Sequence, residues 1–214
     1  MTKILAQISI PLFILFVFLP TVASAHQPRI TESRLTTVSD PEVSKAYYAK
    51  LTGEPDIYVI DASAPFDLYV GVLVPDIAGQ KKDVSAVVLK DGTQIAFLDG
   101  ATFAWEQFFE EFGRDTYWKG PEYRVRAEAG TYEIRVWSTN NDSAYSLAVG
   151  EIESFGPSEI INAYITIPQI KSFFFNKPAY TAFLTPFLGV PLAILLVIAL
   201  FVGIWFWRKK HKTI

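Results

Sequence analysis

The stretch YRVRAEAGTYEIRVWSTNNDSAYSLAV, residues 123–149, decides the fold of this chain. It holds three short runs in which apolar and polar residues alternate, separated by turn signals at Ala129-Gly130 and at residues 140–142. A period of two places successive side chains on opposite faces of a sheet. The stretch therefore predicts an antiparallel meander with one buried face. The apolar members of the three runs are Tyr123, Val125, Ala127, Tyr132, Ile134, Val136, Tyr145, Leu147 and Val149.

Further strands are predicted before this stretch, where β-branched and aromatic runs are bounded by turn residues. They cover residues 57–61, 66–74, 84–89 and 93–98. The run 66–74 is apolar on both faces and is expected in the middle of a sheet, whereas the last two runs form a hairpin through Lys90-Asp91-Gly92. The total of about seven strands in roughly a hundred residues predicts a mainly β protein, an antiparallel jelly-roll-like β-sandwich.

Two short helices are expected beside the strands. The first begins with Asp40 as N-cap and Pro41 at the first helical position, and it runs to about Leu51. The second covers residues 101–112, where four aromatic residues recur at helical spacing and the acidic residues take the other side. We interpret these acids as a solvated helix face rather than as acid–base catalysts. The aromatic set is Trp105, Phe108, Phe109 and Phe112, and the acidic set is Glu106, Glu110 and Glu111.

The two ends of the chain predict its topology. Residues 1–25 carry Lys3, an apolar run and a small-residue site ending at Ala25, which is the pattern of a secretory signal peptide. Residues 184–207 hold no charge and are long enough for a transmembrane helix. Interfacial aromatics and then basic residues end this segment: Trp205, Trp207, Arg208, Lys209 and Lys210. By the positive-inside rule we expect a single-pass type I protein of the cytoplasmic (plasma) membrane, with a periplasmic or extracellular domain.

Charge and composition exclude several classes of function. The chain has no cysteine, so disulfides, thiolate metal sites and cysteine nucleophiles are ruled out. Between residues 26 and 207 lie 14 basic and all 22 acidic residues, a net charge of −8. An acidic domain repels phosphate backbones, so no nucleic-acid partner is expected.

The predicted organisation has six parts. A signal peptide at 1–25 precedes an N-terminal lead-in and helix at 26–55 and a β-sandwich ectodomain at 56–155. A juxtamembrane linker at 156–183, a transmembrane helix at 184–207 and a cytoplasmic basic tail at 208–214 follow. Within the linker, Pro168 argues against one long regular helix. Two alternatives remain open for residues 158–178, which either lie on the outer leaflet or pack back on the sandwich.

The motifs AGTYEIRVW (129–137) and NNDSAYSLAVGE (140–151) resemble the last strands of bacterial pre-peptidase C-terminal (PPC-like) domains. Those domains are jelly-roll-type β-sandwiches appended to secreted enzymes, but no peptidase accompanies the domain here. The blocks DPEVSKAYYAKLTGEP, PFDLYVGVLVPD and YWKGPEYRVRAEAGTYEIRV resemble those of uncharacterised bacterial single-pass membrane proteins. The resemblance implies an architecture and no activity.

His26 is the one candidate metal ligand. Cleavage after Ala25 would leave His26 at the mature N-terminus, where its amine and imidazole form a chelate that suits Cu(II). The arrangement resembles the histidine brace of secreted copper proteins, although a brace needs a second histidine and the domain has none. Chance placement of His26 after the cleavage site is the alternative.

These observations predict a non-enzymatic binding or interaction module on the outer side of a membrane. The domain has no histidine for a hydrolytic triad apart from His26, no glycine-rich phosphate loop and no HExxH motif. A protein or glycan partner is expected, and Trp118 and Trp137 are the candidate exposed binding aromatics. Copper binding through His26 is the alternative function.

Overall fold

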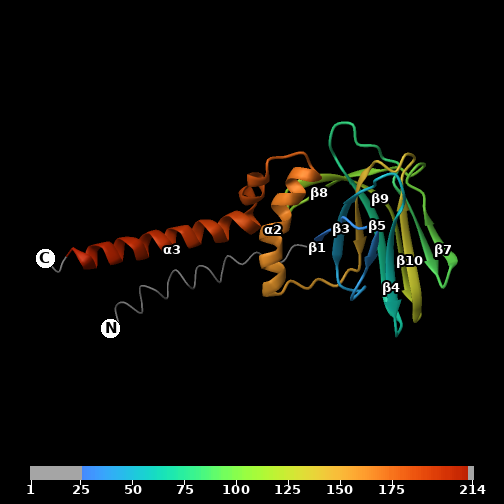
Figure 1. The fold of residues 1–214 in the computed structure, drawn as a ribbon, viewed down its shortest axis with the longest axis horizontal. Coiled ribbons are helices and arrows are strands. Elements are labelled where there is room, and N and C mark those ends of the chain that lie inside the picture. The colour runs from blue at the N-terminus through green and yellow to red at the C-terminus, as the bar shows by residue number, and fades with distance from the viewer. Residues whose placement is uncertain (1–25, 212–214) are drawn as a thin grey trace.

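The structure, a computed structural model, describes residues 26–211 and consists of two β-sheets packed face to face, followed by helices (Figure 1). The six-stranded sheet A has the order β1 (Gln27–Ile30), β3 (Lys45–Lys50), β11 (Ala144–Val149), β5 (Phe66–Pro75), β9 (Asp115–Ala127) and β8 (Glu106–Glu110). The five-stranded sheet B has the order β2 (Leu35–Thr37), β4 (Asp56–Ala62), β10 (Gly130–Trp137), β6 (Ser85–Lys90) and β7 (Thr93–Leu98). The helices are α2 (Pro157–Phe173), the 3-10 helix η1 (Ala179–Leu184) and α3 (Pro186–Lys210).

The predicted β-sandwich is confirmed, with eleven strands in the described part of the chain rather than about seven. The additional strands come from segments without a strong apolar pattern. The short β1 and β2 arise from the polar segment before residue 40 and run parallel to β3 and β4 at the sheet edges. The region 27–50, expected as a lead-in and a helix, therefore supplies strands to both sheets.

The core lies between the two sheets and is filled by alternate residues of each strand. In β10 the side chains of Tyr132, Ile134 and Val136 have at most 1% of their surface exposed. Tyr145 and Leu147 of β11 meet them from the opposite sheet and are fully buried. Because each such side chain contributes about 1.5–3 kcal/mol on burial, this alternation supplies the main driving force for folding.

The predicted meander is wrong, although the alternation that suggested it is real. The consecutive strands β9, β10 and β11 lie in sheets A, B and A, so the chain crosses the sandwich at each turn. The partners of β10 are β4 and β6, and those of β11 are β3 and β5. A period of two specifies only that a strand has one buried face. Strands facing each other across a sandwich satisfy this requirement as well as neighbours within one sheet do.

Two other strand predictions are confirmed. The run 66–74 forms β5, which lies between β11 and β9 in sheet A. The strands β6 and β7 form the expected antiparallel hairpin. Its turn holds Asp91 and Gly92 at φ values of 48° and 79°, the left-handed region that an Asp-Gly hairpin turn requires.

Neither predicted short helix forms. The segment expected as a helix from Asp40 to Leu51 contains β3, because Tyr47, Ala49 and Leu51 alternate into the core. Asp40 adopts φ = 45° and does not cap a helix. The segment 101–112 forms a loop and the edge strand β8. Its aromatic residues lie in different surroundings and do not form one face, so their helical spacing does not reflect a helix.

α2 corrects the expectation for the juxtamembrane linker. It is one helix of 17 residues with Pro168 inside it, and it packs back on sheet A. Proline lacks the N–H that would bond to the preceding turn, which costs about 3 kcal/mol in a helix interior. Burial of Ile167 and Ile170 on the same helix offsets that cost.

The C-terminal apolar segment forms the expected long helix. An 18-residue window of α3 has a mean hydropathy of 2.9, so the helix is long and apolar enough to cross a membrane. Thr185 caps its start and basic residues occupy its last turn. The predicted signal peptide at 1–25 and residues 212–214 lie outside the described residues.

Candidate functional site

A pocket of about 250 Å³ lies between the outer face of sheet A, the β8–β9 turn and α2. Its floor comes from β3, β5, β9 and β11, whose outward-facing side chains are covered by the helix rather than by the other sheet. Most of the wall is apolar, with a few polar groups converging on it. The apolar lining residues are Pro28, Ala46, Leu73, Phe108, Phe112, Ile167 and Ile170. The remaining ones are His26, Tyr48, Glu110, Gly113, Asp115, Tyr117 and Ser146.

A pair of tyrosine hydroxyls lies on the floor of this pocket. Tyr48 of β3 and Tyr117 of β9 share a hydrogen bond of 2.8 Å between their hydroxyl oxygens. Phe174 packs edge-on against Tyr48, and Phe175 packs edge-on against Tyr117, each with ring centroids 5.0 Å apart. Burial raises the pKa of both phenols well above the usual value, so they stay neutral and act as hydrogen-bonding groups.

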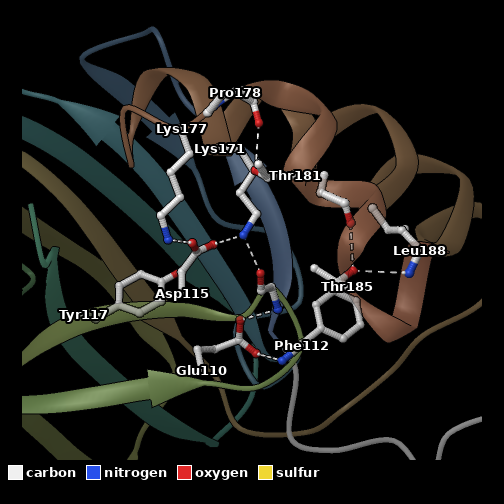
Figure 2. Close-up of polar contacts among 12 residues, drawn as sticks. Glu110, Phe112, Asp115, Tyr117, Lys171, Lys177, Pro178, Thr181, Thr185 and Leu188 are labelled. Carbon is white, nitrogen blue, oxygen red and sulfur yellow. Dashed lines mark hydrogen bonds and ion pairs between the residues drawn. The ribbon is translucent and has the colours of Figure 1, made fainter. Parts of the chain in front are cut away.

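A buried carboxylate ties the sandwich to the helical segment. Asp115, at the start of β9, accepts hydrogen bonds from Lys171 Nζ at 2.6 Å and from Lys177 Nζ at 2.7 Å (Figure 2). Lys171 also donates to the carbonyl of Gly113. The side chains of Asp115 and Lys171 are each only 3% exposed, whereas Lys177 is 44% exposed. Two lysines from the end of α2 and the segment after it therefore neutralise one carboxylate of the sheet.

Glu110 departs from its predicted role on a solvated face. Its two oxygens accept the backbone N–H groups of Phe112 and Gly113 at 2.6 and 2.7 Å, which closes the β8–β9 turn. Burial raises the pKa of this carboxyl, and the backbone hydrogen bonds act in the opposite direction. Arg114 in the same turn adopts φ = 57°, a strained conformation that the capped turn holds in place.

The pocket shares a wall with the start of α3. Phe112 lines the pocket and also contacts Phe187 in the first turn of α3, with ring centroids 3.9 Å apart. Tyr164 of α2 donates a hydrogen bond of 3.1 Å to the carbonyl of Leu188. Figure 2 shows the β8–β9 turn, the lysines and the N-terminus of α3 gathered in one region. The sandwich, α2 and α3 thus meet at a single joint.

The other end of α2 is fixed by a second ion pair. Arg29 of β1 donates to both oxygens of Glu159 at 2.8 and 2.9 Å. Asn162 donates to the carbonyl of Pro28 at 3.2 Å. The helix consequently covers the edge strand β1 and is held to the sandwich at both ends.

His26 lies in the lining of the pocket, with Nδ1 hydrogen-bonded to the hydroxyl of Ser44. Burial lowers the pKa of His26, and the negative charges of Glu153 and Glu151 act in the opposite direction. Among residues 26–211 no group of three or more His, Asp or Glu side chains is placed to hold a metal ion. The side chains that the structure describes therefore do not supply a complete histidine brace.

The tryptophans singled out from the sequence lie apart from this site. The ring of Trp118 is covered by Lys82 at 3.8 Å, and its Nε1 donates to Asp76. Trp137 is stacked on Phe97 of β7 with ring centroids 5.9 Å apart. The residues predicted to lie at a membrane interface are in the last turns of α3: Trp205, Trp207, Arg208, Lys209 and Lys210.

Sequence reasoning missed the residues that build the pocket. The apolar block 173–175 between two lysines was visible, but its partners Tyr48, Tyr117 and Asp115 precede it by more than fifty residues. No local spacing links Asp115 to Lys171, because sheet pairing and helix docking bring them together. The one available signal was an acidic residue at the start of a strand, because such a residue needs a cationic partner if it is buried.

Comparison with known proteins gives only distant similarities. No family model and no curated protein matches the chain. Among solved structures, the pre-peptidase C-terminal domain of a collagenase from Bacillus anthracis is 12% identical, with a TM-score of 0.31 over 59% of this chain and 97% of that chain. A surface-associated copper-binding protein of Methylomicrobium album BG8 is 9% identical, with a TM-score of 0.28 over 57% and 98%. At these values neither likeness carries weight for function, and the β-sandwich assignment rests on the strand order of this chain.

The buried ion pair gives a direct stability prediction. Lys171→Met leaves the buried Asp115 with one partially exposed partner, so we expect the free energy of unfolding to fall by about 3–5 kcal/mol. Lys177→Met removes the more exposed lysine and leaves the buried pair intact, so its loss should be smaller. Denaturant unfolding of the full chain in detergent, followed by near-ultraviolet circular dichroism, measures both. Equal losses for the two variants would contradict the assigned role of Lys171.

Proposed function

We propose that this chain is a non-enzymatic, membrane-anchored binding module whose pocket beneath α2 receives part of a partner. The observation that carries the proposal is the position of the pocket at the joint of sandwich, α2 and α3, where Phe112 contacts both the pocket and the start of α3. Enclosed, mostly apolar concavities with a few convergent polar groups are the usual binding sites of proteins.

The size of the pocket limits the group that it could bind. A volume of about 250 Å³ is below the roughly 300–1,000 Å³ of pockets that hold drug-sized ligands. It fits one bulky apolar group, such as an aromatic or branched side chain. Tyr48, Tyr117 and Ser146 offer neutral hydrogen-bonding groups at its floor. A protein partner that inserts one anchor side chain matches this chemistry best, because such anchors carry most of the energy of interfaces.

The polar groups of the pocket support a binding rather than a catalytic role. Glu110 spends both oxygens on backbone N–H groups, and Asp115 is neutralised by two lysines. A general base must lie within hydrogen-bond reach of a substrate proton, and here both oxygens of each carboxylate already accept a hydrogen bond that holds the structure together. Measured turnover of a hydrolase or oxidase substrate by the purified protein would contradict this part of the proposal.

We place the module on the outer side of a cytoplasmic membrane, as a type I protein cleaved after Ala25. The basic cluster at the end of α3 supports this orientation through the positive-inside rule. The uncharged helix before it supports a single membrane span.

Photo-crosslinking in native membranes tests the binding site. We expect p-benzoyl-phenylalanine at Phe108, in the pocket wall, to give a discrete adduct of higher mass, because the partner's anchor group lies against it. The same group at Phe97 on β7, which is also about half exposed, is the matched control and should give none. Ala46→Phe, which fills the pocket, should abolish the adduct at position 108. An adduct at 108 that persists in the filled pocket would contradict the proposed site.

Copper binding through His26 is the second candidate function. It rests on the place of His26 directly after the predicted cleavage site, where a free amine and the imidazole would form a chelate that suits Cu(II). Nδ1 is occupied by Ser44, so copper would have to displace that hydrogen bond.

A Cu(II) titration of the full chain in detergent decides this alternative. Mass spectrometry first confirms that the mature protein starts at His26. One extra N-terminal residue is the control, because it removes the amine–imidazole chelate. Submicromolar binding that disappears in the control would support a copper protein, and equal weak binding by both proteins would remove the candidate.

A further inference from the structure

We propose that α2 and η1 form a membrane-facing surface that lies in the leaflet on the sandwich's side of the bilayer. This inference uses the membrane anchor of the proposed function but does not depend on the pocket or its partner. The membrane-facing surface is defined by Ile161, Ile165, Tyr180 and Leu184, which are 60–71% exposed.

α2 has two apolar sides, and only one is covered, by the sandwich together with η1 and the start of α3. The buried side consists of Ala163, Thr166, Ile167, Ile170 and Lys171. Ile161 and Ile165 are one turn apart on the other side, and Pro168 continues the same stripe at helical spacing. The exposed side also carries Gln169 and Ser172, which are polar but uncharged. A surface helix of a soluble domain carries charged and polar residues there, whereas an uncharged outward side with large exposed apolar residues is typical of helices that lie in a membrane interface.

The exposed apolar side chains continue directly into the predicted membrane span. Tyr180 and Leu184 of η1 connect α2 to α3, whose own side chains are mostly exposed along its length. Tyrosine is enriched at the membrane–water interface because its ring is apolar and its hydroxyl is polar. The surface therefore lies where the leaflet begins if α3 spans the bilayer.

The arrangement of the helices matches a membrane surface. In Figure 1, α2 lies across the direction of α3 and between α3 and the sandwich. Ala163 and Ile167 pack with Ala182 and Leu188, which fixes this arrangement at the start of α3. With α3 along the membrane normal, α2 runs parallel to the membrane plane and the sandwich faces away from it.

The charge distribution fits the same placement. All 22 acidic residues precede Ile160, so the chain from residue 160 to its end holds no carboxylate side chain that a lipid surface would have to desolvate. The last one, Glu159, is paired with Arg29 on the sandwich. The two lysines between Ile160 and Leu184 are both bound to Asp115.

Spin labelling tests the inference on the full chain. Because the chain has no cysteine, Ile161→Cys and Ile165→Cys can each carry a single nitroxide. The protein is reconstituted at low density in vesicles of phosphatidylcholine and phosphatidylglycerol. Electron paramagnetic resonance power saturation then compares collisions with oxygen, which concentrates in lipid, and with a water-soluble nickel chelate. Leu200→Cys in α3 is the lipid reference, and Gln94→Cys on β7, at the far end of the sandwich, is the aqueous reference.

We expect the ratio of oxygen to nickel collisions at positions 161 and 165 to exceed that at Gln94 several-fold. Values equal to that at Gln94, with Leu200 in lipid, would overturn the inference and leave the anchor intact. An aqueous value at Leu200 would overturn the anchor as well. Labels shielded from both reagents with spin–spin broadening would show that a second copy covers the surface, which also overturns the inference.

Discussion

The buried carboxylate of Asp115 is the interaction on which the rest of this structure depends. A carboxylate that is only 3% exposed would cost several kcal/mol if it stood alone, so it requires a cationic partner, which the equally buried Lys171 supplies. Both lysines that bind Asp115 come from the segment that leads to α3, at positions 171 and 177. Binding them fixes this segment on sheet A and places Phe174 and Phe175, which lie between them, against Tyr48 and Tyr117. The ion pairs thus set the register of α2 on the sandwich, and the aromatic contacts supply the apolar burial.

The pocket is a consequence of this docking geometry. α2 is held at its C-terminal end by Asp115 and at its N-terminal end by Arg29. Between these ends it crosses the outer face of sheet A without contacting all of it, which leaves the pocket. The β8–β9 turn, capped by Glu110, closes one side and carries Phe112 to the start of α3. A ligand group that enters there meets the sandwich and α2, and it meets Phe112, which in turn contacts Phe187 at the start of α3. The pocket wall and the contact to α3 therefore share one side chain, Phe112.

Sequence reasoning recovered those parts of the fold that depend on local pattern. The inward sets of β10 and β11, the β6–β7 hairpin, the central position of β5 and the long apolar helix α3 follow from periodicity, turn chemistry and hydropathy. The assignment of strands to sheets does not follow from these patterns, because alternation identifies the buried face of a strand but not the strand that pairs with it. The apolar spacing of segments 40–51 and 101–112 is compatible with a helix or with a strand. Pairing with neighbouring strands made the regular part of each segment a strand, β3 and β8. The prediction that Pro168 interrupts the helix was wrong, because burial of its neighbours offsets the cost of the proline. The candidate site depends on Asp115 and Lys171 meeting across 56 residues, which no local signal encodes.

The central claim is that Asp115 fixes the segment between the sandwich and α3, so that the two keep one relative position. The most direct test is a double electron–electron resonance distance between nitroxides at Thr93→Cys on β7 and Val197→Cys in α3, in nanodiscs. The structure predicts one narrow distance distribution for the otherwise unaltered chain, which broadens when Lys171→Met breaks the joint. A broad distribution in the presence of the intact ion pair would mean that the sandwich moves freely on its anchor, and it would contradict the claim.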